Sequence, residues 1–332
     1  HKWLGLVALL VFPLLLQQVG NGWVRIVDVA LLYVMLALGL NVVVGYAGLL
    51  DLGYVAFYAV GAYMFALLAS PHLLDTFPAL AAMFPQGLHM PLWVVIPLAA
   101  LLAGVTGALL GAPTLKLRGD YLAIVTLGFG EIIRIFMNNL DHPVNLTNGP
   151  RGIGSIDPVT VMGHPLSRPL DLGFITLPSV TLYYYLFLAL VLISVLVCHR
   201  LAHSRIGRAW MAIREDELAA RAMGISITRI KIAVYAISGT LAGFAAMLAI
   251  SRIGSAEPAA NTSILLNSVA AVVLGGVSLF GGRGTIIGPF IATLLLQALT
   301  NGLTVVGVAA YYQYVSIGVV VIISAALVRT TQ

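Results

Sequence analysis

Two ionisable side chains, Glu131 and Arg134, stand inside one long apolar stretch of the sequence. Their i, i+3 spacing places both on one face of a helix, where the carboxylate and the guanidinium can form an ion pair. Charged groups are costly in hydrocarbon, so they pair with each other, face a neighbouring helix or line a polar path. We therefore interpret them either as a self-neutralising structural pair or as residues of a path or gate.

Other polar residues and glycines lie within or beside apolar stretches. Amides and hydroxyls can hydrogen-bond a small neutral solute, and glycine exposes the backbone to a cavity. Asp28 and Asp51 lie near the ends of such stretches, where their side chains can reach a membrane interface. Gln297 and Asn301 are further amides inside predicted spans. The candidate path or gate residues are Asn41, Tyr46, Gly48, Asp51, Thr126, Glu131, Arg134, Asn267, Gly275 and Gly276.

The composition indicates which elements must position these residues. Of 332 residues, 60% are hydrophobic and only 9% are charged, against roughly 25% charged in an ordinary soluble domain. So apolar a chain cannot cover itself with polar surface in water. The net charge of +5 does not indicate nucleic-acid binding, because the arginines lie in short loops between apolar runs. The single cysteine, Cys198, excludes an internal disulfide, and we expect no metal site.

We predict an all-α integral membrane protein, a bundle of about ten transmembrane helices. About 20 apolar residues cross the hydrocarbon core as a helix, and no sheet edge can face lipid. The charge-free run Gly284–Val328 has 45 residues and must therefore hold two helices. The predicted spans lie near residues 3–19, 26–45, 49–69, 91–112, 120–139, 179–198, 230–251, 263–280, 285–303 and 310–328.

The basic residues predict the orientation. Ten spans place both termini on one side, and twelve of the seventeen lysines and arginines fall on that side. Four lie on the other side, and Arg134 lies inside a span, so the termini are expected in the cytoplasm. Residues 1–332 then form one transmembrane domain, with an outer loop at 140–178 and a cytoplasmic loop at 199–229. We expect the first span to be a retained helix rather than a signal peptide, and a segment to precede His1.

Two glycine runs, Gly45–Gly48 and Gly281–Gly284, recur in the two halves of the chain. Small residues let membrane helices approach closely, which is their simplest role. Alternatively, these runs break the helix at a cavity. Their recurrence suggests an internal pseudo-repeat.

The cytoplasmic loop contains an amphipathic segment, predicted as one helix over 205–223. Ser204 is a suitable N-cap, and Gly224 can end the helix in a left-handed turn. Two apolar stripes flanked by charges suit a helix between the bundle and a second protein, or one lying on the membrane surface. Glu217 and Arg221 have the spacing of a bracing ion pair. The candidate docking residues are Arg208, Trp210, Ile213, Arg214, Glu215, Asp216, Glu217, Leu218, Arg221, Met223 and Gly224.

Four segments in order, 117–132, 147–153, 207–224 and 273–276, resemble the LivM-type permeases of branched-chain amino acid ABC importers. Residues 218–224 also resemble the EAA-type loop of ABC importer permeases, with Leu218 where glutamate usually stands and Glu217 displaced by one. The resemblance runs from about residue 35 to about residue 325. It implies an ABC importer permease-like fold in a bacterial inner membrane, with the coupling helix in loop 199–229.

The resemblance also implies partners. These are a LivH-like second permease, two ABC ATPase subunits of the LivG/LivF type and a periplasmic amino acid-binding protein that delivers leucine, isoleucine or valine. The chain itself has no GxxxxGK[ST] phosphate loop, so we expect no enzymatic activity and no bound cofactor, with ATP and Mg on the partner ATPases. The alternatives are a cation-coupled secondary transporter of small neutral solutes, with Asp51, Glu131 and Arg134 as coupling residues, and a channel or membrane scaffold.

Overall fold

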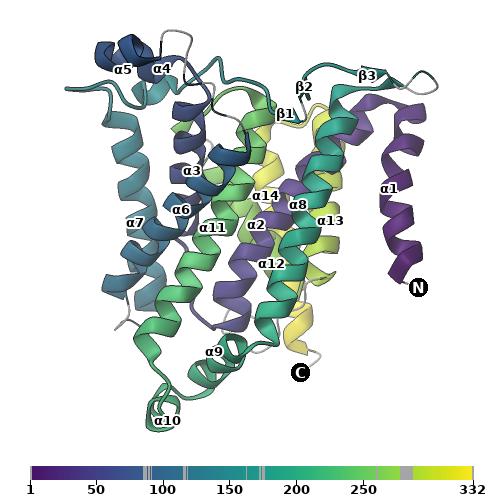
Figure 1. Ribbon diagram of the computed structural model, residues 1–332. Coiled ribbons are helices and arrows are strands. Elements are labelled where there is room, and N and C mark those ends of the chain that lie inside the picture. The colour runs from purple at the N-terminus through teal and green to yellow at the C-terminus, as the bar shows by residue number, and fades with distance from the viewer. Residues whose placement is uncertain are drawn as a thin grey trace.

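A computed structural model describes residues 2–84, 88, 90, 92–114, 117, 119–161, 163–171, 173, 176–258, 261–276 and 287–330. Long helices run side by side through the molecule (Figure 1). They are α1 (Lys2–Val19), α2 (Asn21–Asn41), α3 (Tyr54–Leu68), α6 (Leu92–Thr114), α7 (Asp120–Asn139), α8 (Ser179–Ala202), α11 (Ile227–Ile253), α12 (Asn261–Leu274), α13 (Ile287–Val305) and α14 (Ala310–Thr330).

Six of these helical segments are long and apolar enough to cross a membrane, counted over the described residues. They are Asn21–Tyr46, Val94–Thr114, Tyr121–Asn139, Ser179–Ala202, Ile227–Ile253 and Gly288–Val305. Four shorter apolar helices accompany them: Ala8–Val19, Tyr54–Leu68, Ile264–Leu274 and Ala310–Ser324. The structure therefore establishes a largely helical membrane protein, and the predicted count of ten spans stays a prediction.

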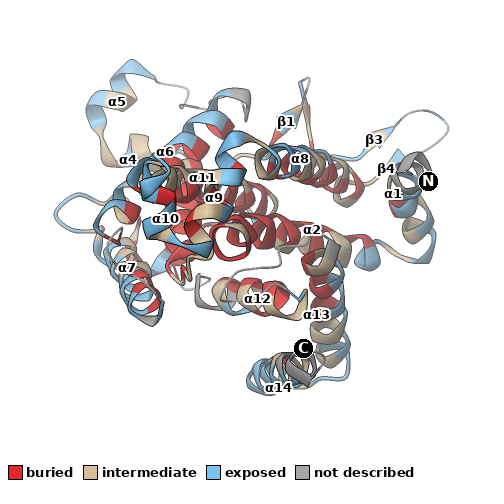
Figure 2. Cartoon of the chain, turned by 90° about the horizontal axis from the view of Figure 1, so that it is seen from below, coloured by how far each residue is buried: buried red, intermediate tan, exposed pale blue. Residues whose placement is uncertain are grey.

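Helix α11 occupies the centre and packs along α6, α3 and α2. The α6–α11 contact is built from small residues, so the two backbones meet directly. A Cβ atom added at Gly239 would lie 2.5 Å from the carbonyl oxygen of Ala103, and one at Gly104 would lie 2.6 Å from Thr240 Oγ1. Such close approach is the means by which membrane helices associate without a hydrophobic driving force. Figure 2 shows the buried residues gathered on α2 and α11, with α7 and α14 largely exposed at the periphery.

The two ends of the bundle carry different structures. At one end, residues 140–178 contain a 3₁₀ turn (Gly149–Arg151) and two small hairpins. Strand β1 (Thr160–Val161) pairs with β2 (His164–Pro165), and β3 (Leu170–Asp171) pairs with β4 (Thr176–Leu177), both antiparallel. The short helices α4 (His72–Thr76) and α5 (Pro78–Met83) lie at this same end, which we call the hairpin end (Figure 1).

The opposite end carries α9 (Arg205–Glu215) and α10 (Glu217–Ala222). The prediction of one helix over 205–223 is wrong, because Asp216 adopts an extended backbone (φ −153°, ψ 115°) and divides it. The Asp216 carboxylate accepts hydrogen bonds from the amides of Leu218 and Ala219, at 2.7 and 3.1 Å, and so caps the start of α10. An aspartate satisfies free amides in this way better than it serves a helix interior.

The first glycine run marks a helix end. Helix α2 continues as a π-helix over Val42–Tyr46, and the segment 47–53 that follows is not helical before α3 begins. Gly48 has φ +66°, a conformation that L side chains rarely adopt. The second run, Gly281–Gly284, lies outside the residues that the structure describes.

Candidate coupling and gating site

The segment 47–53, which we call the α2–α3 turn, is fixed to α7. The amide of Leu52 donates to Thr126 Oγ1 at 3.0 Å, and that hydroxyl in turn donates to the carbonyl of Ala123. A Cβ at Gly53 would clash with the carbonyl oxygen of Thr126, so the turn touches the α7 backbone. Two predicted path residues, Gly48 and Thr126, therefore belong to one structural unit.

Asp51 is buried within this unit rather than reaching a membrane interface. Its side chain is 1% exposed, and Oδ1 accepts a hydrogen bond from the Gly53 amide at 2.8 Å. Thr126 and Tyr235 share with it a cavity of only about 10 Å³, which has room for at most one water molecule. The sequence suggested an interfacial aspartate because Asp51 lies near the start of the span predicted at 49–69. In the fold, α7 and α11 close over it.

Helices α9 and α10 carry two sets of apolar residues, one packed against the bundle and one exposed at the surface. Trp210 is 1% exposed and Ile213 is buried, whereas Leu218 and Met223 are 68% and 83% exposed. The expected cap at Ser204 is present, since its Oγ accepts from the Gly207 amide at 3.3 Å. Gly224 has φ +83° and turns the chain toward α11. Trp210 and Ile213 therefore anchor α9 to its own bundle, and the outward apolar residues belong to α10 and its end.

Two contacts join α9 and α10 to the bundle at their meeting point. Glu217 lies 2.6 Å from Lys231 Nζ of α11, and both side chains are nearly buried, at 12% and 5% exposed. The stem of Arg214 covers the α2–α3 turn so closely that a Cβ at Gly48 would lie 2.6 Å from Arg214 Cγ. Beyond this stem, Arg214 Nη2 forms an ion pair with Glu215 Oε1 at 2.9 Å.

A cavity of about 300 Å³ lies between these groups. Its walls include Gly48 from the turn, Gly119 and Leu122 from the start of α7, and Lys231 from α11. The same space is also lined by Glu215, Asp216 and Glu217. Arg208 donates to the carbonyl of His203, and Arg221 lies exposed on α10. Five of the eleven predicted docking residues thus line one polar cavity that also touches the turn and α7: Ile213, Arg214, Glu215, Asp216 and Glu217.

Glu131 and Arg134 form the ion pair that their spacing predicts. Arg134 Nε donates to both carboxylate oxygens of Glu131, at 3.0 and 2.9 Å. The pair lies on the outward side of α7, with side chains 36% and 52% exposed for Arg134 and Glu131, in that order. Among the residues that the structure describes, it therefore faces no neighbouring helix. Ionisable residues of membrane helices are typically paired with one another and face a bundle interior or a water-filled cavity.

The remaining path candidates lie outside the α2–α3 turn, although Tyr46 directly precedes it. Asn267 of α12 donates to the Tyr33 hydroxyl of α2 at 3.2 Å, and Asn41 is buried near the end of α2. Tyr46 is partly buried at the end of the π-helix. Gly275 meets the backbone of Pro289, and Gly276 has φ +76°, so both shape the end of α12. The predicted path residues therefore fall into two groups, one on the α2–α3 turn and α7, the other along α2 and α12.

Sequence reasoning missed a buried charge at the hairpin end. Asp28 is completely buried and lies 3.6 Å from Arg252 Nη1 of α11, instead of reaching the interface as predicted. The only signal was that each charge interrupts an otherwise apolar helix. Since 224 positions separate them, no local spacing could reveal the pair.

These features define a multi-pass α-helical membrane protein that carries two short helices, α9 and α10, at one end of its bundle. The chain belongs to the family described as branched-chain amino acid transport system / permease component, which matches residues 22–325. It is 42% identical over 304 residues to the high-affinity branched-chain amino acid transport system permease protein LivM of Escherichia coli (strain K12). That similarity covers 88% of this chain and 66% of the relative.

The LivM protein of Salmonella typhimurium is also 42% identical, over 291 residues, covering 84% of this chain and 63% of that protein. The ribose import permease protein RbsC of Escherichia coli (strain K12) is 44% identical over 126 residues, or 38% of this chain and 39% of that protein. The chain thus spans slightly less than two thirds of the LivM relatives. No solved structure matches it. Its relatives are transport permease subunits, which are not enzymes.

Proposed function

We propose that this chain is a transmembrane permease subunit of an ATP-driven importer for branched-chain amino acids: leucine, isoleucine and valine. The observation that carries the proposal is the 42% identity to LivM across 88% of the chain. The family membership does not favour a cation-coupled secondary transporter. The path would carry a small, net neutral, partly apolar solute, because Glu131 and Arg134 neutralise each other and the other predicted path groups are mainly amides, hydroxyls and glycine backbone.

The proposed assembly contains a LivH-like second permease, two LivG/LivF-like ATPases that bind ATP and Mg, and a periplasmic amino acid-binding protein. The exposed side of α10, with Leu218, Arg221 and Met223, supports a docking site for an ATPase. The exposed ion pair on α7 supports a second contact, because a partner permease or the path between the two subunits would supply the polar surroundings that Glu131 and Arg134 need.

The contacts of the site suggest how movement of an ATPase would reach the membrane part. A push on α10 would pass through Glu217 to Lys231 and α11, and through Arg214 to Gly48 of the α2–α3 turn. The amide of Leu52 in the turn donates a hydrogen bond to Thr126 of α7, so the turn would pass the displacement to α7. Because α7 also holds Glu131 and Arg134, this route joins the proposed docking helix to the proposed path.

The proposed topology has ten spans, with both termini and loop 199–229 in the cytoplasm and loop 140–178 outside. It is supported by the charge distribution and by the location of these two loops at opposite ends of the bundle (Figure 1). Single cysteines at Leu218 and Arg168, placed in a Cys198→Ser background, test it in intact cells with an impermeant thiol reagent. We expect labelling at position 168 alone. Labelling at 218 alone would reverse the orientation.

Uptake in proteoliposomes tests the function. The chain is co-reconstituted with its partner subunits and the binding protein, with ATP at the ATPase side and no ion gradient. We expect accumulation of labelled leucine that stops when ATP is replaced by a non-hydrolysable analogue. Uptake that follows an imposed proton or sodium gradient without ATP would contradict the proposal.

A further inference from the structure

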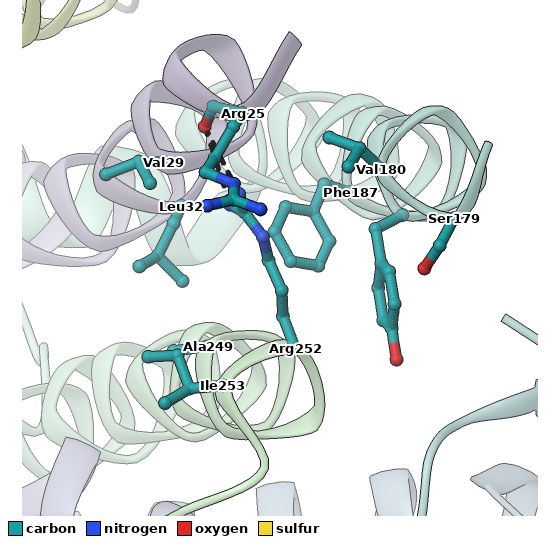
Figure 3. Close-up of a pocket in the computed structure, with 10 residues that line it drawn as sticks. Arg25, Val29, Leu32, Ser179, Val180, Phe187, Ala249, Arg252 and Ile253 are labelled. Carbon is teal, nitrogen blue, oxygen red and sulfur yellow. Dashed lines mark hydrogen bonds between the residues drawn. The ribbon is translucent and has the colours of Figure 1, made fainter. Parts of the chain in front are cut away.

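A cavity of about 430 Å³ opens at the hairpin end of the bundle, between the start of α2, the start of α8 and the end of α11 (Figure 3). Its walls are mostly apolar and include Val29, Leu32 and Phe187. Two guanidinium groups, from Arg25 of α2 and Arg252 of α11, reach into it. The cavity is well separated along the helices from α9, α10 and the α2–α3 turn, so it is not part of the proposed coupling site.

The charges in this cavity are unbalanced. Arg252 donates to the carbonyl oxygen of Arg25 through Nη1 and Nη2, both at 3.5 Å, and lies 3.6 Å from the buried carboxylate of Asp28. The Arg25 side chain makes no hydrogen bond or ion pair with any residue that the structure describes. Two guanidinium groups therefore share one carboxylate, and one positive charge remains for an anion. A guanidinium offers several donors in one plane, which suits a phosphate or a carboxylate.

A second cavity lies beside the first, on another side of the start of α2. It has a volume of about 750 Å³, lies between α2 and α13, and shares Arg25 and Val29 with the first cavity. Its other walls include Trp23, Ile26 and Gly302, with Val305 at the end of α13. We call it the α2–α13 groove. Trp23 is 55% exposed beside Arg25, and tryptophan typically lies at the level of lipid headgroups.

We propose that these two neighbouring cavities, which share Arg25 and Val29, bind one anionic phospholipid. Its phosphate lies between Arg25 and Arg252, and an acyl chain lies in the α2–α13 groove. An amphiphile satisfies both halves of the site, because its head neutralises the unbalanced charge and its tail fills the apolar groove. Free phosphate or the carboxylate of a soluble amino acid would occupy the first cavity and leave the groove empty. The proposal depends on the membrane location of the chain and is independent of its substrate.

Native mass spectrometry of the purified full chain in detergent tests the proposal, with phosphatidylglycerol and phosphatidylcholine offered at equal concentration. We expect the wild-type chain to prefer phosphatidylglycerol, and Arg25→Gln to reduce that preference about fivefold, the effect typical of one basic residue near a lipid surface. Arg168→Gln is the matched control, since it removes an exposed arginine at the same end and leaves both cavities intact. An equal preference in the wild type and Arg25→Gln would overturn the proposal.

A second variant tests the groove. A side chain at Gly302 meets nothing within 4 Å, so Gly302→Leu fills the groove without a clash and is expected to weaken binding of both lipids, with Arg25 intact. Competition by excess inorganic phosphate and by leucine separates the sources of the anion. Neither is expected to displace the bound phospholipid. Displacement by either one, or unchanged lipid binding in Gly302→Leu, would show a soluble-anion site instead and overturn the lipid assignment.

Discussion

The carboxylate of Glu217 lies 2.6 Å from the ammonium group of Lys231, so the first turn of α10 is tied to the first turn of α11. Both side chains are nearly buried, which makes loss of either partner costly. We expect Glu217→Gln alone to destabilise this end of the chain by about 3 kcal/mol, because it removes the carboxylate that lies 2.6 Å from a buried ammonium group.

Glu217→Gln combined with Lys231→Gln is the matched control, because it removes both charges together. We expect the double variant to recover part of the stability that the single variant loses. Thermal unfolding of the detergent-purified protein measures both. A double variant that melts no higher than the single one would contradict the importance of this pair.

Buried and exposed apolar residues of α9 and α10 are expected to differ in what their substitution changes. Substituting a buried residue should lower stability, and substituting exposed residues should weaken ATPase binding. Trp210→Ala removes a side chain that is 1% exposed and should destabilise the packing of α9 by about 3 kcal/mol or more. Leu218→Ser and Met223→Ser change exposed residues, so we expect unchanged thermal stability but weaker ATPase co-purification. Normal ATPase retention in the combined Leu218→Ser, Met223→Ser variant would place the docking surface elsewhere.

Gly48 is expected to tolerate no side chain. Its φ of +66° strains any L residue, and its Cβ would lie 2.6 Å from Arg214 Cγ. We expect Gly48→Val to leave the chain in the membrane but to lower leucine uptake at least tenfold at unchanged ATPase co-purification. Gly128→Val of α7 is the control, because a Cβ there meets nothing within 4 Å. Equal uptake in both variants would remove the α2–α3 turn from the proposed coupling route.

The ion pair on α7 predicts a pattern of partial rescue. Glu131→Gln leaves Arg134 with an uncompensated charge on the membrane helix, so we expect reduced uptake or reduced association with the second permease. Glu131→Gln with Arg134→Gln removes both charges and should restore part of the loss. Uptake and co-purification measured side by side distinguish a path defect from an assembly defect. A double variant no better than the worse single one would contradict the pairing.

The close contact between α6 and α11 predicts that folding is sensitive to the size of the side chains placed there. Gly239→Val places a side chain where even a Cβ atom would be 2.5 Å from a backbone oxygen. The two helices would have to separate, so we expect little folded protein by size-exclusion chromatography in detergent. Gly318→Val on the exposed side of α14 has open space around the new Cβ and should purify normally.

Hydropathy predicted the long helices well, because lipid demands apolar residues over a fixed length whatever the neighbouring helices are. Local spacing likewise predicted the Glu131–Arg134 pair, the Ser204 cap and the left-handed turn at Gly224. Each of these depends on residues within a few positions of one another. The family motifs predicted membership in the branched-chain amino acid permease family.

The sequence could not place groups whose partners are distant in the chain. The burial of Asp51 depends on α7 and α11, the pairing of Asp28 depends on Arg252, and the contact of Gly48 depends on Arg214. The interruption at Asp216 was missed for another reason. The stretch around it has good helix formers and charges at helical spacing, but an aspartate that caps a new helix competes successfully with continuation of the old one.

The glycine contact between α6 and α11 has a mechanical consequence. Where a glycine of one helix meets the backbone of the other, as Gly239 meets Ala103, no side chain lies between them that could change rotamer, so we expect the two helices to move together. Helices α6 and α11 would then move as one rigid body, so a displacement that begins at α10 would not change the contact between them. The displacement would instead appear where contacts are looser, along the exposed length of α7.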